Sequence, residues 1–203
     1  KNKTLKNVGD ALVGFGLMLS GLSALSGRIN ALKSYDFLSG FAYVDNPFLL
    51  FLFGAAVAAV TQSSSAITGI LITFSENSFA AFYRAIFIIT GSNVGSCAAV
   101  ILSSANKSEP AREAAVFNFV FNAFGAILFL PILVAAKNFL PVIFPHSATD
   151  AGRAMADFHT VFNLLSSLAA FPLLKFLCGV TQKLVAGQKR ALRRKFSKNK
   201  KTA

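Results

Sequence analysis

The amino-acid sequence predicts an all-α integral membrane protein with about four transmembrane helices, one of them broken, and one re-entrant helical hairpin. Two observations favour this fold class. The chain is 54% hydrophobic and only 14% charged, whereas about a quarter of the residues in soluble domains are charged. Its apolar residues also gather in runs close to the roughly 20 residues that a helix needs to cross a bilayer.

The basic charge of the chain lies at its two ends. Lys1, Lys3 and Lys6, together with the Lys and Arg residues after position 182, account for the whole net charge of +12. A nucleic-acid-binding protein places such charge on a binding face, so we expect no nucleic-acid partner. The tail, residues 183–203, is typical of the cytoplasmic end of a membrane protein. Contact with membrane lipid is an alternative role, and its polar composition predicts disorder.

Four apolar segments form the predicted spans of a membrane domain over residues 1–182. They are residues 8–25, 78–102, 114–136 and 155–177. Four crossings return the chain to the side from which it started, and the positive-inside rule makes that side cytoplasmic. We therefore expect a multi-pass protein of the plasma (inner) membrane with both termini in the cytoplasm. Because the sequence begins at Lys1 rather than Met, we also expect a fragment.

The hairpin is predicted from a polar break, "TQSSS", inside the apolar stretch of residues 47–74. As a helix, the first arm, residues 47–61, is about 22 Å long at about 1.5 Å per residue. This is short of the roughly 30 Å hydrocarbon core, and the second arm, residues 66–74, is shorter still. A polar break at membrane depth is tolerated only where it is buried in protein or lines a wet cavity.

A second interruption, "GSNVGS", lies inside the span of residues 78–102. Gly91 and Gly95 permit unusual backbone angles, and Asn93 and Ser96 bring polar atoms to mid-membrane depth. This favours a helix that is unwound over residues 91–96. The alternative is that the Gly-x-x-x-Gly spacing marks a face on which another helix packs.

An internal repeat with an offset of 41 residues relates the last two spans. The matching residues include Phe117 and Phe158, Asn122 and Asn163, and Pro131 and Pro172. Each span carries a polar pair four residues apart, Asn118 with Asn122 and His159 with Asn163, which shares one helix face. Such pairs are expected to point into the bundle, either behind a binding site or as hydrogen bonds between helices. Cys97 and Cys178 lack metal-ligand spacing and are expected to be packing residues.

A polar hairpin tip and a broken helix near the midplane are the parts from which secondary transporters build binding sites. Free backbone N–H groups at a helix N-terminus suit an oxyanion, and neutral oxygen ligands suit a hard cation such as Na+. The side chains offering neutral donors and acceptors are Gln62, Ser63, Ser64, Ser65, Thr68, Asn93 and Ser96. Sodium is expected to bind through Gln62, Ser65 and Asn93, and we expect no other cofactor.

"QSSSA" and "GSNVGS" resemble the type II sodium/phosphate cotransporter family, whose usual patterns are Gln-Ser-Ser-Ser-Ala-Thr and Gly-Ala-Asn-Ile-Gly-Thr. The segment from His159 to Asn163 also looks like the His-x-x-Phe-Asn helices of that family, and the resemblance covers about residues 9–174. It implies that residues 62–65 form a hairpin that binds ions and phosphate. It also implies that Gly91, Asn93, Gly95 and Ser96 form the facing broken helix of a sodium-coupled carrier for uptake of inorganic phosphate.

The sequence departs from the family pattern in several places. Ser92 replaces an Ala, Ser96 replaces a Thr, and Ile67 stands where Thr is common. Only one Gln-Ser-Ser-Ser segment is present, so the chain looks like one half of an inverted-repeat transporter, most like the C-terminal half. A complete site would then need a second half, either a missing N-terminal part or another chain.

Two alternative functions and one alternative role for a residue stay open. The first alternative function is a channel or scaffold, which also uses re-entrant segments. Ser64 or Ser96 with His159 suggests an intramembrane serine hydrolase, but the serines form a run, and Asp157 lies two residues from His159 and so points elsewhere on a helix. We therefore expect no enzyme. Arg84 is expected to be structural, with an oxyanion clamp as the alternative.

Overall fold

The computed structural model describes residues 3–32, 44–74 and 76–199, and all secondary structure assigned within these ranges is helical. Three helices in the described residues are long and apolar enough to cross a membrane: Phe79–Ser104, Glu109–Ala135 and Ala151–Gly187. A bent pair of shorter helices makes a fourth if it counts as one span. The predicted class, an all-α membrane protein, is confirmed.

The chain divides into two compact units, with the second beginning at Asp45. The first unit contains α1, Lys3–Leu32, a 30-residue helix that includes the predicted span of residues 8–25. Large apolar side chains such as Leu12, Phe15 and Met18 are exposed on α1. This helix is not among the candidate membrane spans found in the described residues, so its crossing of the membrane stays a prediction.

The second unit opens with the hairpin, formed by α3, Pro47–Thr61, and α4, Ser64–Phe74. Asn46 begins α3 because its side chain accepts hydrogen bonds from the N–H groups of Phe48 and Leu49 at 2.9 and 3.2 Å, with Pro47 as the first helical residue. The two helices are bent by 119°. The first arm is as predicted, whereas the second begins two residues earlier than predicted. Its re-entry into the membrane stays a prediction.

The turn between the arms is made by Gln62 and Ser63. Gln62 adopts a left-handed conformation, φ 60° and ψ 18°, and is the one non-glycine residue with positive φ in the described ranges. A left-handed residue ends an α-helix. Ser63 then begins α4, since its Oγ accepts a hydrogen bond from the N–H of Ala66 at 3.1 Å.

The next span consists of α5, Phe79–Gly95, and α6, Cys97–Ser104. The prediction of an unwound segment over residues 91–96 is wrong in extent. The chain is helical through Gly95, and the interruption is Ser96 alone, whose φ of −60° and ψ of −19° remain close to helical values. The glycines in this segment therefore serve another purpose.

That purpose is direct contact between the backbones of α3 and α5. Three glycines lie where a Cβ atom would overlap a carbonyl oxygen of the other helix. The pairs are Gly54 with Ile88, Gly91 with Phe51, and Gly95 with Ala55. Glycines at such crossings let helix axes approach more closely than any side chain would allow. The alternative interpretation of the Gly-x-x-x-Gly spacing, a packing face, is therefore correct.

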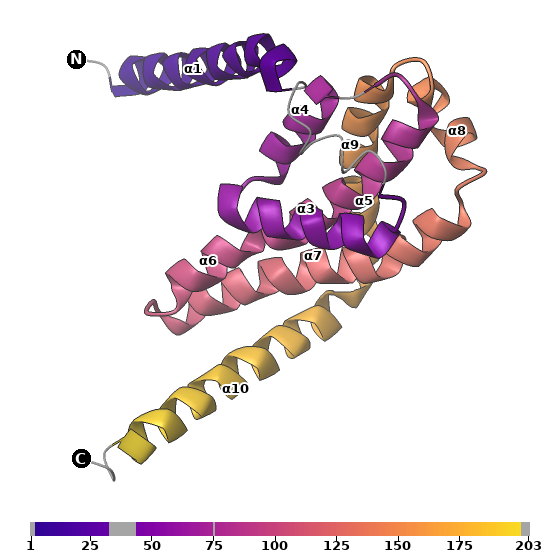
Figure 1. Cartoon of the computed structure of the whole chain (residues 1–203). Coiled ribbons are helices and arrows are strands. Elements are labelled where there is room, and N and C mark those ends of the chain that lie inside the picture. The colour runs from indigo at the N-terminus through magenta and orange to yellow at the C-terminus, as the bar shows by residue number, and fades with distance from the viewer. Residues whose placement is uncertain (1–2, 33–43, 75, 200–203) are drawn as a thin grey trace. The chain divides into compact units, whose positions relative to one another are not determined.

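The rest of the unit follows α6, and α7 and α9 are further neighbours of α5 (Figure 1). After α7, Glu109–Ala135, the chain turns through α8, Leu140–Ile143, and the short helix η1, Pro145–Ser147. It then forms α9, Ala151–Ala170, the turn η2, Phe171–Leu173, and α10, Leu174–Asn199. Helix α9 packs against α4, α5 and α7. Rings of Phe82, Phe144 and Phe158 from α5, the turn after α8 and α9 meet with centroids 5.4–6.5 Å apart.

The basic tail is helical as far as the structure describes it. Helix α10 continues to Asn199 and runs on beyond the other helices of this unit (Figure 1), and so includes most of the tail, residues 183–203, for which the sequence predicts disorder. Lys, Arg, Gln, Ala and Leu are strong helix formers, and a helix that is already nucleated in the span adds such residues at little cost. Residues 200–203 lie outside the described ranges.

Candidate functional site

The hairpin turn brings together two helix ends of opposite polarity. The last carbonyl groups of α3 and the first N–H groups of α4 lack partners within their own helices. They therefore present partial negative and partial positive charge at the same place. Around them, Gln62 and Ser65 are exposed, and Ser63 and Ser64 are half-buried. This tip can bind a cation and an oxyanion side by side.

One turn further along α4, Thr68 connects the hairpin to α9. Thr68 is 4% exposed, and its Oγ1 donates a hydrogen bond to the carbonyl oxygen of Ser64 at 3.0 Å. The same Oγ1 lies 3.4 Å from Nδ1 of His159, a residue 91 positions later in the chain. The structure thus unites two residues that the sequence predicts for the site, and His159 contacts Thr68 rather than Ser64 or Ser96.

Asn93 is the buried polar residue of α5 whose side-chain nitrogen has no partner among the described residues. It is 4% exposed, and its Nδ2 forms no hydrogen bond with the described residues. A buried amide without a partner costs about 1–3 kcal/mol, and such a donor in a folded protein calls for an explanation, such as a ligand with an acceptor atom. By contrast, the neighbouring hydroxyls of Ser92 and Ser96 donate to the carbonyls of Ile89 and Asn93 at 2.8 and 3.0 Å.

The polar pair on α7 meets a thiol rather than the hairpin. Asn118 and Asn122 each place Nδ2 3.4 Å from Sγ of Cys97, and that thiol lies 3.4 Å from the carbonyl oxygen of Asn93. The prediction for these two asparagines left two roles open, and the structure shows the hydrogen bonds between helices. Asn163 donates to the carbonyl of His159 within α9 at 2.8 Å.

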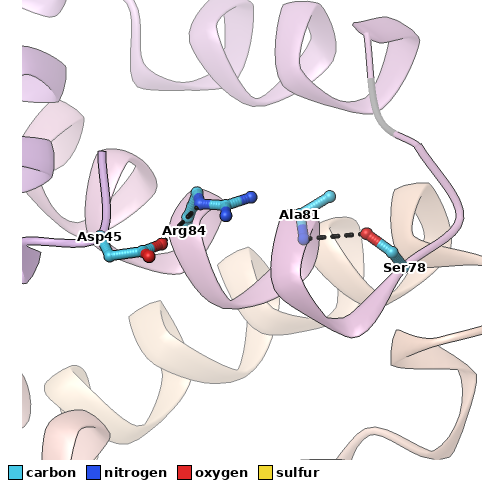
Figure 2. Close-up of polar contacts among 4 residues, drawn as sticks. All are labelled: Asp45, Ser78, Ala81 and Arg84. Atoms are coloured by element: carbon cyan, nitrogen blue, oxygen red, sulfur yellow. Dashed lines mark hydrogen bonds and ion pairs between the residues drawn. The ribbon is translucent and has the colours of Figure 1, made fainter. Parts of the chain in front are cut away.

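An ion pair joins the start of the hairpin to α5. Nε of Arg84 lies 3.0 Å from Oδ1 of Asp45, and the two side chains are 26% and 82% exposed. Figure 2 shows this pair, together with the hydrogen bond from the N–H of Ala81 to Ser78 that begins α5. The pair lies at the N-terminal ends of α3 and α5, whereas the hairpin tip follows the opposite end of α3.

A pocket of about 280 Å³ lies elsewhere, between α7 and α10. Its lining residues are Pro110, Glu113, Ala114, Phe117, Cys178, Thr181 and Gln182. None of them belongs to the predicted site.

The comparison with known families decides what kind of protein carries this hairpin. Residues 36–170 match the family described as Na+/Pi-cotransporter. The chain belongs to this family. The resemblance predicted from "QSSSA" and "GSNVGS" is thereby confirmed, and the apolar helices identify a multi-pass membrane protein of a transporter family.

Three relatives of this chain are bacterial. It is 31% identical to "Uncharacterized protein YqeW" of Bacillus subtilis (strain 168), over 83% of the chain and 54% of that protein. It is 21% identical to "Putative inorganic phosphate export protein YjbB" of Salmonella typhimurium, over 91% of the chain and 34% of that protein. The protein of the same name in Escherichia coli O157:H7 is 24% identical, over 85% of the chain and 31% of that protein.

The chain therefore spans about half the length, or less, of these relatives. No solved structure gives a significant match.

The hairpin contacts the predicted facing helix, α5, through its first arm, α3. Gly91 and Gly95 lie against the backbone of α3, so in this structure they position the hairpin instead of offering unwound backbone to an ion. Within the described residues, no hydrogen bond joins residues 62–65 to residues 91–96. The ligand contacts predicted for both segments stay predictions.

Sequence reasoning missed Asp45 and Cys97. Cys97 was expected only to pack, yet it accepts two amide donors. The available signal was its position four residues after Asn93, on the same helix face. Asp45 directly precedes the residue that begins α3, but nothing in the sequence connects it to Arg84.

Proposed function

We propose that this chain is one half of a sodium-coupled transporter that takes up inorganic phosphate, with phosphate and Na+ bound at the hairpin tip. The observation that supports this most directly is the meeting of two helix ends at residues 62–65. The N-terminus of α4 and the hydroxyls of Ser63, Ser64 and Ser65 suit the anion. The C-terminal carbonyls of α3, with Gln62 and Asn93, suit Na+.

Coupling follows from charge. A phosphate dianion that binds together with a sodium ion leaves a net charge of −1 to desolvate, which is less than the charge of the dianion alone. Each ligand therefore favours the other, by a coupling free energy of typically about 1–3 kcal/mol that is the same in both directions. An inward Na+ gradient then drives phosphate inward.

The exposure of the tip supports a second half. Gln62, Ser65 and Asn118 are exposed in this structure, although each belongs to a segment that we assign to the membrane. Polar groups at such depth face protein or a water-filled cavity rather than lipid. A second half, from further sequence or from another chain, would cover this face and complete the site. The shorter length of the chain relative to its relatives is in keeping with this proposal.

The test is transport in proteoliposomes that contain the transporter with both halves. Radioactive phosphate should accumulate above equilibrium when Na+ is high outside, and not when K+ replaces Na+. Two relatives carry the word "export" in their names, so the opposite gradient is tested in the same preparation. If phosphate only equilibrates across the membrane, at a rate that does not depend on Na+, the protein is a channel and the proposal is overturned.

A matched pair of variants connects transport to the tip. Ser64→Ala removes a hydroxyl from the proposed site, and phosphate affinity should fall by about 1–3 kcal/mol, together with a change in apparent Na+ affinity. Ser103→Ala is the control, because Ser103 is exposed on α6 and its Oγ donates only to the carbonyl of Val100 at 3.0 Å. Equal behaviour of both variants would remove the serine run from the site.

A further inference from the structure

The hydrogen bonds of Thr68 favour one tautomer of His159, the one with its proton on Nδ1. A threonine hydroxyl has one proton to donate, and Thr68 directs it to the carbonyl oxygen of Ser64 at 3.0 Å. The long contact of 3.4 Å between Thr68 Oγ1 and His159 Nδ1 is then attractive only if Nδ1 is the donor. A neutral imidazole with a proton on Nδ1 has a lone pair on Nε2.

That lone pair has no partner within the protein as described. No hydrogen bond among residues 3–32, 44–74 and 76–199 uses Nε2 of His159, and the side chain is half-buried. Its helical neighbours Phe158 and Phe162 are 3% exposed. Nε2 is not among the fully buried unpaired atoms of the described residues, so it is accessible to a ligand that donates a hydrogen bond.

The ring also lies close to the first turn of α4. Ser64, Thr68 and His159 form one continuous chain of contacts, in which Thr68 is a single helical turn from Ser64. Under the proposed function, on which this inference rests, the first turn of α4 binds the anion. His159 is therefore connected by two hydrogen bonds to the place where phosphate binds.

We propose that Nε2 of His159 accepts a hydrogen bond from the protonated oxygen of hydrogenphosphate and thereby selects phosphate over sulfate. Phosphate keeps at least one proton near neutral pH, whereas sulfate keeps none. Backbone N–H groups only donate, and a serine hydroxyl that donates to an anion oxygen does so to phosphate and sulfate alike. A fixed lone pair attracts the P–OH group and repels a bare sulfate oxygen, which is the usual way that a buried polar group creates specificity.

The first test uses the unaltered transporter, with both halves present, at one pH near neutrality. Binding of radioactive phosphate is measured in the presence of Na+ with sulfate or unlabelled phosphate as the competitor. Sulfate should compete at least about tenfold more weakly than phosphate, the value of one hydrogen bond to a charged group. Equal competition by sulfate would overturn the inference. Absence of Na+-dependent phosphate binding would instead overturn the proposed function.

The second test uses two substitutions, each of which keeps a polar group near the position of one of the two ring nitrogens. His159→Asn retains a donor near the position of Nδ1 and can still contact Thr68, but it has no group at Nε2. His159→Gln places a carbonyl oxygen near Nε2 and gives up the contact with Thr68. The Asn variant should lose about tenfold in phosphate affinity and most of its discrimination against sulfate, whereas the Gln variant should retain both.

A purely structural role for His159 predicts the reverse order, with Asn tolerated and Gln impaired. A cationic His159 that donates from Nε2 predicts that the Asn variant loses phosphate and sulfate affinity equally. Either result would overturn the inference. The thermal midpoint of each variant in detergent shows whether it is folded, and the competition ratio of the unaltered protein remains decisive if a variant does not fold.

Discussion

Replacing Gly91 by alanine adds a methyl group where α3 and α5 touch. The new Cβ would overlap the carbonyl oxygen of Phe51 and would lie 2.8 Å from its carbonyl carbon and 3.1 Å from the backbone nitrogen of Ala55. All three atoms belong to the backbone of a helix, so no side-chain rotation relieves the contact. The two helices have to move apart.

The size of the effect follows from three terms. Overpacking of a tight interface costs about 1–3 kcal/mol. A gap of about 0.5–1 Å elsewhere along the contact also forfeits between a quarter and a half of its dispersion attraction. Alanine returns about 1 kcal/mol because it is the better helix former. We expect Gly91→Ala to lower the free energy of unfolding by about 2 kcal/mol.

The assay is the unfolding midpoint of the purified transporter in detergent, compared with Gly179→Ala. Gly179 lies on α10, and no atom lies within 4 Å of the position that a Cβ would take there. The same substitution should therefore be neutral there, or stabilising by up to about 1 kcal/mol. If Gly91→Ala were as stable as Gly179→Ala, the close contact of α3 with α5 would be refuted.

Three further outcomes are expected. Asn93→Ala removes an unpartnered buried amide, so the free energy of unfolding measured without Na+ should stay unchanged or rise. Phosphate binding that depends on Na+ should become weaker. A lower free energy of unfolding without Na+ would show that the amide has a structural partner. Asp45→Asn breaks an exposed ion pair and should change the unfolding free energy by less than about 1 kcal/mol. If Arg84→Ala abolished phosphate binding in a folded protein while Asp45→Asn left it intact, Arg84 would be an anion ligand instead. A cysteine at Lys107, in the turn between α6 and α7, should react with a membrane-impermeant thiol reagent only from the cytoplasmic side, and labelling from outside would contradict the predicted topology.

The sequence predicted the hairpin well because its signal is local. A polar break between two apolar arms determines where the helices end, and Asn46 and Pro47 mark the beginning of the first arm. The family could likewise be predicted, because its motif occupies consecutive positions. The second arm began earlier than predicted since serines also serve as helix N-caps and first-turn residues.

The role of the glycines could not be predicted in the same way. Glycine is suited both to unwound backbone and to close packing, and the sequence does not show which helix lies opposite Gly91. The contact of Thr68 with His159 joins residues from different helices and leaves no pattern in the chain. The tail was predicted from charge alone, whereas its helix propensity and its continuity with the span decide its structure.

The contact between α3 and α5 has a consequence for how the protein is made. During synthesis α3 emerges before α5 exists, and at about 22 Å it is too short to cross a hydrocarbon core of about 30 Å by itself. The surface on which it rests is backbone exposed by glycines that are translated more than thirty residues later. The hairpin can therefore pack in its final position only after α5 has been made. Substitutions at these glycines should therefore lower the amount of assembled protein in the cell, because the chains stall during biogenesis and are degraded before they can transport.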